Sequence, residues 1–322
     1  MCGIIGANFH HKDFEKATNI MSNRGPDFSC VNEFGLSTLG HTRLSIIDLD
    51  NEANQPLVFD NLSIVFNGEI YNYKQLIKEH NLTMQTKSDT EVIVRLYEKY
   101  DEKFLNFLNG AFSFCIYDLQ KEKFFCARDR YGKKPFFYYQ KDAKFIFSSM
   151  IKPISTLLGN TPKLNEVALS QYLQYFVPLT PNTFYQDIYK LDAGSYLVFE
   201  NEELKIKKYY KINTYKKIKD ETKALQSIED ILVNSIETRL ESDVEIGSLL
   251  SGGIDSSLVS TLYSQISGKQ IQTFSVGYTE HKQYSELPFA NLLAKHIGSS
   301  HTALEINQKD YIEALDDVLE NL

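Results

Sequence analysis

The chain has 322 residues, which is long for one typical domain and comfortable for two. Hydrophobic residues make up 43% and charged residues 24% of the sequence, as in ordinary globular proteins with a self-sufficient core. The net charge of −8 argues against nucleic-acid and anionic-membrane partners, and no apolar run reaches membrane-spanning length.

Cys2 is the first informative residue in the chain. If Met1 is removed, Cys2 carries both the thiol and the α-amine of the chain. That amine has a reference pKa of about 7.7–8, so it can act as a base. This pattern predicts an N-terminal nucleophile hydrolase, although an ordinary cysteine at position 2 remains an alternative. The four cysteines form no CxxC pair or Cys/His cluster, so we expect neither zinc nor disulfides, and reduced thiols favour a cytoplasmic location.

The sequence up to about residue 210 is rich in predicted strands, with a few helices. The strand-like runs cover residues 3–8, 62–67, 111–118, 123–128 and 135–139. Ser88 is predicted to cap a helix in which Glu91 closes a capping box. The lysine-rich segment 210–222 is the predicted linker between two domains.

After this linker the pattern alternates between helices and strands. It predicts an amphipathic helix over 225–240, strands over 244–250 and 272–278, helices over 256–264 and 285–296, and a further helical pattern over 311–319. Alternation of this kind predicts a parallel sheet with crossover helices. Because a three-strand parallel sheet is normally covered on both faces, and the last helical pattern has no cap, we expect this chain to be the N-terminal part of a longer protein.

A glycine-rich turn at residues 251–257, Ser-Gly-Gly-Ile-Asp-Ser-Ser, lies between the predicted strand 244–250 and the helix after it. Adjacent glycines let backbone N–H groups approach a polyphosphate, and the helix N-terminus adds its positive dipole end. Asp255 can hold Mg²⁺ against phosphate oxygens. The Walker A spacing and lysine are absent, and a plain strand-to-helix turn with serine caps is the alternative.

This turn resembles the pyrophosphate loop of the ATP pyrophosphatases, which adenylylate a carboxylate and release pyrophosphate. The resemblance implies that ATP contacts Leu249, Leu250, Ser251, Gly252, Gly253, Asp255, Ser256 and Val276, with Mg²⁺ on Asp255. From sequence alone, a simple core valine is an equal interpretation of Val276.

Four further segments form a second pattern: residues 22–27 (SNRGPD), 41–48 (HTRLSIID), 66–72 (FNGEIYN) and 88–91 (SDTE). With Cys2, they resemble the class II glutamine amidotransferase domain. Together with the phosphate loop, they resemble the glutamine-hydrolysing asparagine synthetase family over nearly the whole chain. This implies an α+β N-terminal nucleophile hydrolase domain of stacked antiparallel sheets at 1–210, then an incomplete α/β ATP-pyrophosphatase-like domain at 211–322.

The resemblance implies a role for each matching residue. Cys2 attacks the glutamine side-chain amide, and the Asn67 amide with the Gly68 N–H forms the oxyanion hole. Arg43 pairs with the α-carboxylate of glutamine, and the α-ammonium is bound by Glu69 and Asp89. Each residue also has a plainer interpretation: Asn67-Gly68 as a hairpin turn, Arg43 as a surface ion-pair partner, and Asp89 as a helix-dipole residue.

The implied reaction makes asparagine from aspartate, with ammonia from glutamine and ATP-Mg²⁺ as the activating nucleotide. A sugar-acid amidotransferase of surface-polysaccharide assembly and a non-catalytic binding protein on a decayed scaffold are the alternatives. The partners implied are the small molecules glutamine, aspartate and ATP, with no nucleic acid and no membrane, and a homodimer is left open. The sequence departs from the family pattern at Asn23, where a histidine is usual, and at Asp192-Ala193, where two prolines are usual.

Overall fold

The computed structural model describes residues 1–213, 217–280 and 282–321, and the chain forms two compact units, Met1–Asn213 and Thr214–Leu322. Residues 214–216 of the predicted linker lie outside the described residues. Among the residues described, no helix combines the length and the apolar character that crossing a membrane requires.

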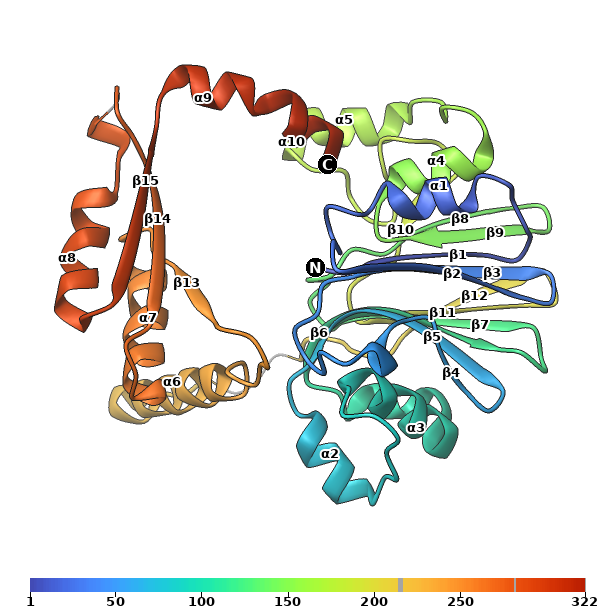
Figure 1. The fold of residues 1–322 in the computed structure, drawn as a ribbon, viewed down its shortest axis with the longest axis horizontal. Coiled ribbons are helices and arrows are strands. Elements are labelled where there is room, and N and C mark those ends of the chain that lie inside the picture. The colour runs from blue at the N-terminus through green and yellow to red at the C-terminus, as the bar shows by residue number, and fades with distance from the viewer. Residues whose placement is uncertain (214–216, 281, 322) are drawn as a thin grey trace. The chain divides into compact units, whose positions relative to one another are not determined.

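The first unit contains two six-stranded antiparallel sheets (Figure 1). The first sheet has the strand order β10-β8-β9-β1-β3-β2. Its strands are β1 (Gly3–Ala7), β2 (Phe28–Phe34), β3 (Ser37–Arg43), β8 (Phe137–Lys141), β9 (Lys144–Ser148) and β10 (Ile188–Lys190). The second sheet has the order β12-β11-β7-β6-β5-β4. Its strands are β4 (Leu57–Phe59), β5 (Leu62–Ile70), β6 (Gly110–Asp118), β7 (Lys123–Arg128), β11 (Ser195–Glu200) and β12 (Glu203–Lys208).

The two sheets face each other across an aromatic-rich core, and helices cover their outer faces (Figure 1). Phe124, Phe145 and Phe147 are fully buried in this central layer. The first sheet is covered by α1 (Phe14–Asn19) and α4 (Ile151–Leu158), and the second by α2 (Tyr73–His80) and α3 (Asp89–Tyr100). The expected stacked antiparallel sheets with helices are therefore confirmed. The remaining helix, α5 (Glu166–Tyr175), and the short 3-10 helices Asn51–Ala53 and Asp101–Asn106 lie in connections.

In the first unit, two local predictions are wrong in part. The predicted strand 62–67 continues to Ile70 as β5, so Asn67 and Gly68 are strand residues and the hairpin-turn interpretation is wrong. Ser88 does cap α3, accepting a hydrogen bond from the Thr90 N–H, but Glu91 closes no capping box. The Glu91 carboxylate instead accepts hydrogen bonds from the backbone N–H groups of Gln85 and Thr86, because the chain before the helix folds back over its first turn.

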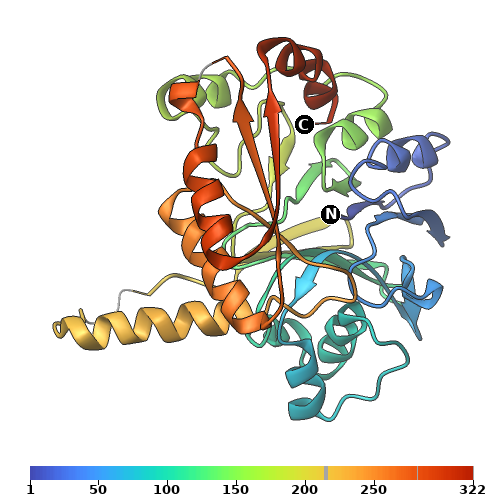
Figure 2. The same cartoon turned by 60° about the vertical axis from the view of Figure 1, so that its left-hand side comes forward.

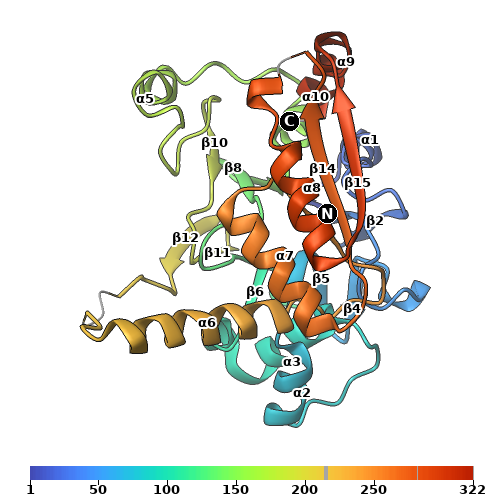
Figure 3. The ribbon, with the colours of Figure 1, turned by 90° about the vertical axis from the view of Figure 1, so that its left-hand side faces the viewer.

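The second unit contains a parallel sheet of order β13-β14-β15, as expected. Its strands are β13 (Gly247–Leu249), β14 (Gln272–Tyr278) and β15 (Ser300–Ile306), and β13 is shorter than the predicted strand 244–250. α7 (Ile254–Ser267) and α8 (Leu287–Ile297) lie on one face of the sheet, while α6 (Glu221–Glu237) runs across the strand direction (Figures 2 and 3). The helical pattern 311–319 is divided between α9 (Gln308–Glu313) and α10 (Leu315–Asn321), and Lys282–Tyr284 forms a 3-10 turn.

Burial alternates along β14 because the described helices of this unit cover one face of the sheet. Thr273 and Ser275 are buried, whereas Phe274 and Val276 on the other face are 40% and 59% exposed. Among the described residues, the second face of this sheet is therefore apolar and exposed. Val276 is on that face and is not buried among the described residues.

Candidate active site

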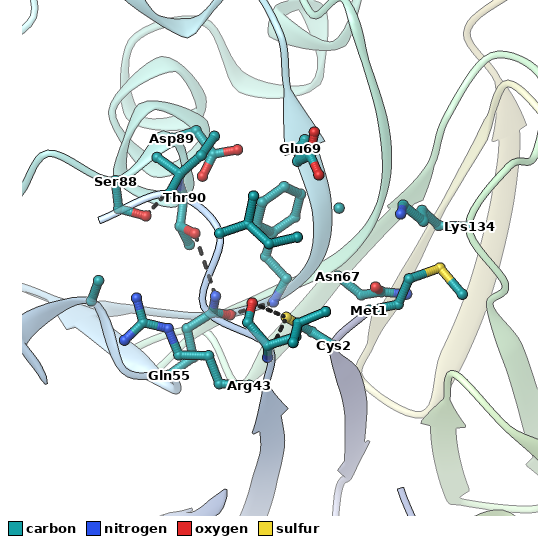
Figure 4. A pocket seen from close by; sticks show the side chains of 16 residues that line it. Met1, Cys2, Arg43, Gln55, Asn67, Glu69, Ser88, Asp89, Thr90 and Lys134 are labelled. Atoms are coloured by element: carbon teal, nitrogen blue, oxygen red, sulfur yellow. Dashed lines mark hydrogen bonds between the residues drawn. The ribbon is translucent and has the colours of Figure 1, made fainter. Parts of the chain in front are cut away.

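Cys2 lies at the edge of a cavity of about 120 Å³ in the first unit, together with the other residues assigned to a glutaminase site (Figure 4). The antiparallel pairing of β1 with β3 places Gly3 opposite Thr42, which brings Cys2 beside the end of β3. The Cys2 thiol contacts the Leu44 backbone, with Sγ 3.7 Å from the carbonyl oxygen and 3.5 Å from the nitrogen. Burial raises the pKa of the Cys2 thiol above its ordinary value, so forming its thiolate at neutral pH would require a nearby base.

The register of β5 determines which backbone groups face this cavity. β4 pairs with β5 only from Leu62 to Ile64, so the later part of that edge lacks a β4 partner. Backbone N–H groups two residues apart in a strand point to the same edge. On this edge the Phe66 N–H donates to Gln55 Oε1 at 2.6 Å, and the Ile70 N–H donates to Asp89 Oδ2 at 2.8 Å. The N–H of Gly68, midway between them, therefore points toward the same edge, where Gly68 lines the cavity.

Gly68 is required by close packing between β5 and β6. A Cβ atom at this position would lie 2.2 Å from the Ala111 carbonyl oxygen and 2.7 Å from the Phe112 Cα. Such a contact is far below any van der Waals distance, so a side chain would force the two strands apart. The glycine thus keeps the backbone N–H at position 68 in its place.

Asn67 is the most unusual polar residue of the cavity. Its side chain is fully buried, and neither amide atom has a hydrogen-bond partner among the described residues. A buried amide without partners is costly, and native proteins normally satisfy such groups. Since Asn67 lines the cavity beside Cys2, a bound ligand can supply the missing partner (Figure 4).

Arg43 contributes a buried positive charge at one end of the cavity. Its side chain is only 4% exposed, so it is not the surface ion-pair partner that the plain interpretation suggests. The guanidinium donates to the backbone carbonyls of Asp48 and Asp50 and to Asn54 Oδ1. These acceptors are neutral, so they hold the side chain in position without compensating its charge. A carboxylate is the ligand that such a planar cation favours.

Two carboxylates, Glu69 and Asp89, also line the cavity. Asp89 is buried in the first turn of α3, where its Oδ2 atom accepts the Ile70 N–H. Burial, supported by the nearby negative charge of Glu69, raises the pKa of Asp89 to about 7. A positively charged ligand group would relieve this unfavourable burial of negative charge. The cavity thus combines a cation for a carboxylate with two acids for an ammonium group.

Sequence reasoning missed three polar residues near Cys2. Gln55 and Lys134 line the cavity, and the Arg24 Nε donates to the Cys2 carbonyl oxygen at 3.1 Å. Arg24 belongs to one of the motifs noted above, but Gln55 and Lys134 lie outside them all. Only the tertiary structure brings these two residues to the site.

The second unit holds the predicted phosphate loop between β13 and α7. The Ser251 and Ser256 hydroxyls are 2.8 Å apart, and the Gly253 N–H donates to Ser251 Oγ at 3.2 Å. No side chain of the described residues caps the α7 N-terminus, so its first-turn N–H groups remain suited to an anion. Of the flanking residues, Leu249 is 82% exposed and Leu250 is buried. Within the described ranges, no group of three His, Cys, Asp or Glu side chains could hold a metal, so Asp255 would contribute a single carboxylate.

Two family models match the chain: a glutamine amidotransferase domain at residues 1–210 and asparagine synthase at residues 227–322. In the solved structure of glutamine phosphoribosylpyrophosphate amidotransferase from Bacillus subtilis, 94% of this chain aligns with 81% of that chain. The TM-score is 0.50 and the sequence identity 15%, which indicates a shared fold.

Curated relatives share more of the sequence. A Methanocaldococcus jannaschii protein with the provisional name asparagine synthetase [glutamine-hydrolyzing] 2 is 32% identical over 98% of this chain and 67% of its own length. Asparagine synthetase [glutamine-hydrolyzing] 3 of Bacillus subtilis is 28% identical over 99% of this chain and 56% of its length. Asparagine synthetase B [glutamine-hydrolyzing] of Escherichia coli is 29% identical over the same shares. The chain thus spans between about half and two thirds of the length of these relatives. With both family models matched in order, the chain belongs to the glutamine-hydrolysing asparagine synthetase family.

Proposed function

We propose that this chain releases ammonia from glutamine at the Cys2 cavity, as the glutaminase part of a glutamine-dependent asparagine synthetase. The observation that carries this proposal is the buried Asn67 amide, which has no partner among the described residues and lies beside a free thiol. In the proposed pose, the α-carboxylate of glutamine pairs with Arg43, and its α-ammonium lies between Glu69 and Asp89. The side-chain amide then reaches Cys2.

The proposed reaction proceeds through a thioester. After removal of Met1, the Cys2 α-amine takes the thiol proton, and the sulfur attacks the side-chain carbonyl carbon of glutamine. The oxyanion accepts hydrogen bonds from the Asn67 amide and the Gly68 N–H. Collapse breaks the C–N bond, and the proton held by the amine leaves with ammonia. Water then hydrolyses the thioester, which gives glutamate and restores the thiol.

For the second unit, we propose that residues 251–256 bind the phosphates of ATP, with the first-turn N–H groups of α7 directed at them. Asp255 would be one ligand of a Mg²⁺ ion whose other ligands are phosphate oxygens and water, as Mg²⁺ commonly prefers. The ion would neutralise phosphate charge as pyrophosphate leaves. Aspartate is proposed as the acceptor because the relatives described above are named asparagine synthetases.

The test of the proposed glutaminase is glutamate release by the wild-type chain and by Cys2→Ala. We expect the substitution to abolish turnover while the thermal unfolding temperature stays near that of the wild type. Cys30→Ala is the matched control, because Cys30 is also a free, partly exposed thiol but does not line the cavity. Turnover by Cys2→Ala within tenfold of wild type would exclude Cys2 as the nucleophile. Retention of Met1, checked by mass spectrometry, should inactivate equally because the amine is then misplaced.

A further inference from the structure

Hydrogen bonds to the Lys134 backbone fix the position of this residue. Its N–H donates to Asp129 Oδ2 at 3.0 Å, and its carbonyl accepts the Arg128 Nε–H at 2.7 Å. The Asp129 carboxylate also accepts the N–H groups of Tyr131 and Lys133, so this one buried acid orders the whole turn. These hydrogen bonds thus order the backbone from which the Lys134 side chain extends.

The Lys134 side chain lies near Met1 and Asn67 in the cavity. It lines the cavity with Met1 and Cys2, and Figure 4 shows it on the Asn67 side, away from Arg43. In the proposed pose Arg43 already pairs with the α-carboxylate of glutamine. A second cation is therefore not needed for the head group, and Lys134 shares the cavity with the N-terminal residues instead.

The amine of Met1, one residue before the Cys2 nitrogen that becomes the N-terminus when Met1 is removed, is surrounded by charges of both signs. Arg24 and Lys134 are the cations acting on it, while Glu69 and the Cys2 thiolate act in the opposite sense. Burial is the largest cause of the lowered pKa of this amine, and the two cations lower that pKa further. A neighbouring positive charge has this effect because it disfavours the protonated, charged form of an amine.

We propose that Lys134 keeps the Cys2 α-amine uncharged at neutral pH, so that the amine can take the thiol proton once Met1 has been removed. Lys134 is thus a positioning residue that acts through the amine rather than by touching glutamine. The inference rests on the proposed glutaminase function and extends it to a residue outside the motifs of the sequence.

The experiment compares Lys134→Gln, Lys134→Arg and Lys133→Gln. Lys133 is the matched control because it is exposed, adjacent and equally charged, but does not line the cavity. The measurement is kcat at saturating glutamine from about pH 5.5 to about pH 9. Bound glutamine keeps Asp89 ionised, so the acid limb of kcat reports the amine that takes the thiol proton. We expect Lys134→Gln to move that limb upward by about 0.5–1 pH unit, as one unit charge acting across a partly solvated pocket would. Lys134→Arg and Lys133→Gln should keep the wild-type limb.

An acid limb that stays in place in Lys134→Gln would overturn the proposal. A raised KM at every pH with an unmoved limb would also overturn it, and would show that Lys134 orients Glu69. Should Lys134→Gln unfold at lower temperature, Lys134→Met provides a second neutral variant.

A measurement that does not depend on glutamine turnover tests this inference separately from the proposed function. The pKa of the Cys2 amine can be followed by NMR in protein labelled with ¹⁵N-cysteine and freed of Met1. A higher amine pKa in Lys134→Gln than in wild type supports the inference even if glutamine is not the substrate, and an equal pKa contradicts it.

Discussion

The carboxylate of Asp89 accepts a hydrogen bond from the Ile70 backbone N–H at 2.8 Å, at the same edge of β5 to which the Gly68 N–H points. One acid therefore fixes the end of the strand that carries the proposed oxyanion hole, and it also lines the cavity. Keeping this carboxylate ionised in its buried position costs free energy, because burial raises the pKa of Asp89 to about 7.

Asp89→Asn should therefore stabilise the ligand-free protein at alkaline pH. The folded protein binds a proton at Asp89 more tightly than the unfolded chain, so the wild type loses stability as pH rises from about 4 to about 7. Asn cannot ionise, and its carbonyl can still accept the Ile70 N–H. At pH 8 the variant should be more stable by an amount on the order of 2–4 kcal/mol, and the difference should vanish near pH 4. Urea unfolding at both pH values measures it, and a gain that does not depend on pH would contradict the assigned ionisation.

Glutamine binding should depend on the same ionisation. If the α-ammonium lies beside Asp89, binding favours the ionised acid and releases a proton below about pH 7. In Cys2→Ala, which cannot turn over, the dissociation constant should rise by up to about tenfold for each pH unit below 7. Titration calorimetry in buffers of different ionisation enthalpy measures both the affinity and the proton released. In Cys2→Ala/Asp89→Asn binding should be weaker, and this pH dependence should be absent.

Asn67→Ala should lower kcat for glutamine hydrolysis by about 10²–10³ with little change in KM, because the amide is needed only when the oxyanion forms. Stability should suffer less than at a typical buried residue, since the amide has no partner among the described residues. Ser113, the cross-strand partner of Asn67, is a suitable control because its hydroxyl is also buried without a described partner. Ser113→Ala should keep wild-type kinetics, whereas a rise in KM alone for Asn67→Ala would assign Asn67 to ground-state binding.

The sequence predicts features that depend on residues close together in the chain better than features that depend on tertiary contacts. The Ser88 cap depends on its own helix, and it was correctly predicted. The residues matched to family motifs, among them Cys2, Arg43 and Asn67, do lie around one cavity. Lys134 could not be placed in this way, because its approach to Cys2 depends on a turn ordered by Asp129 and Arg128.

Glu91 shows how a local motif can mislead. Ser88 and Glu91 have the spacing of a capping box, but the Glu91 carboxylate bonds the segment that precedes the cap, which no pattern within the helix predicts. Similarly, the strand ending predicted at Asn67 was wrong because Asn-Gly is a common turn pair. Pairing of Gly68 with Phe112 of β6 overrides that local preference.

Glu91→Ala should lower the free energy of unfolding by about 2–4 kcal/mol, because the fully buried carboxylate satisfies the Gln85 and Thr86 N–H groups and pairs with Arg95 at 3.0 Å. Glu98→Ala is the control, since Glu98 pairs with the same arginine at 3.3 Å but from a partly exposed position. It should cost less than about 1 kcal/mol. Equal losses in the two variants would mean that Glu91 acts only through Arg95.

The two glycines of the phosphate loop should respond differently to substitution. At Gly252, φ is +83°, and an added Cβ would lie 2.7 Å from the Phe289 Cβ and 2.9 Å from the Ala290 nitrogen of α8. Gly252→Ala should therefore push α8 away from the loop and destabilise the second unit by about 1–3 kcal/mol. At Gly253, φ is −71° and the nearest atom to an added Cβ is the movable Ser251 Oγ at 3.3 Å. Gly253→Ala should leave stability within about 0.5 kcal/mol of wild type.

Hydrogen exchange of the α8 amides measures this difference, with the β1 amides of the first unit as an internal reference. We expect faster exchange in α8 for Gly252→Ala alone. If the loop binds phosphates through closely approaching backbone N–H groups, Gly253→Ala should weaken ATP binding without this loosening. Unchanged ATP affinity in Gly253→Ala would place the nucleotide elsewhere, whereas unchanged α8 exchange in Gly252→Ala would show that the loop and helix can separate at little cost.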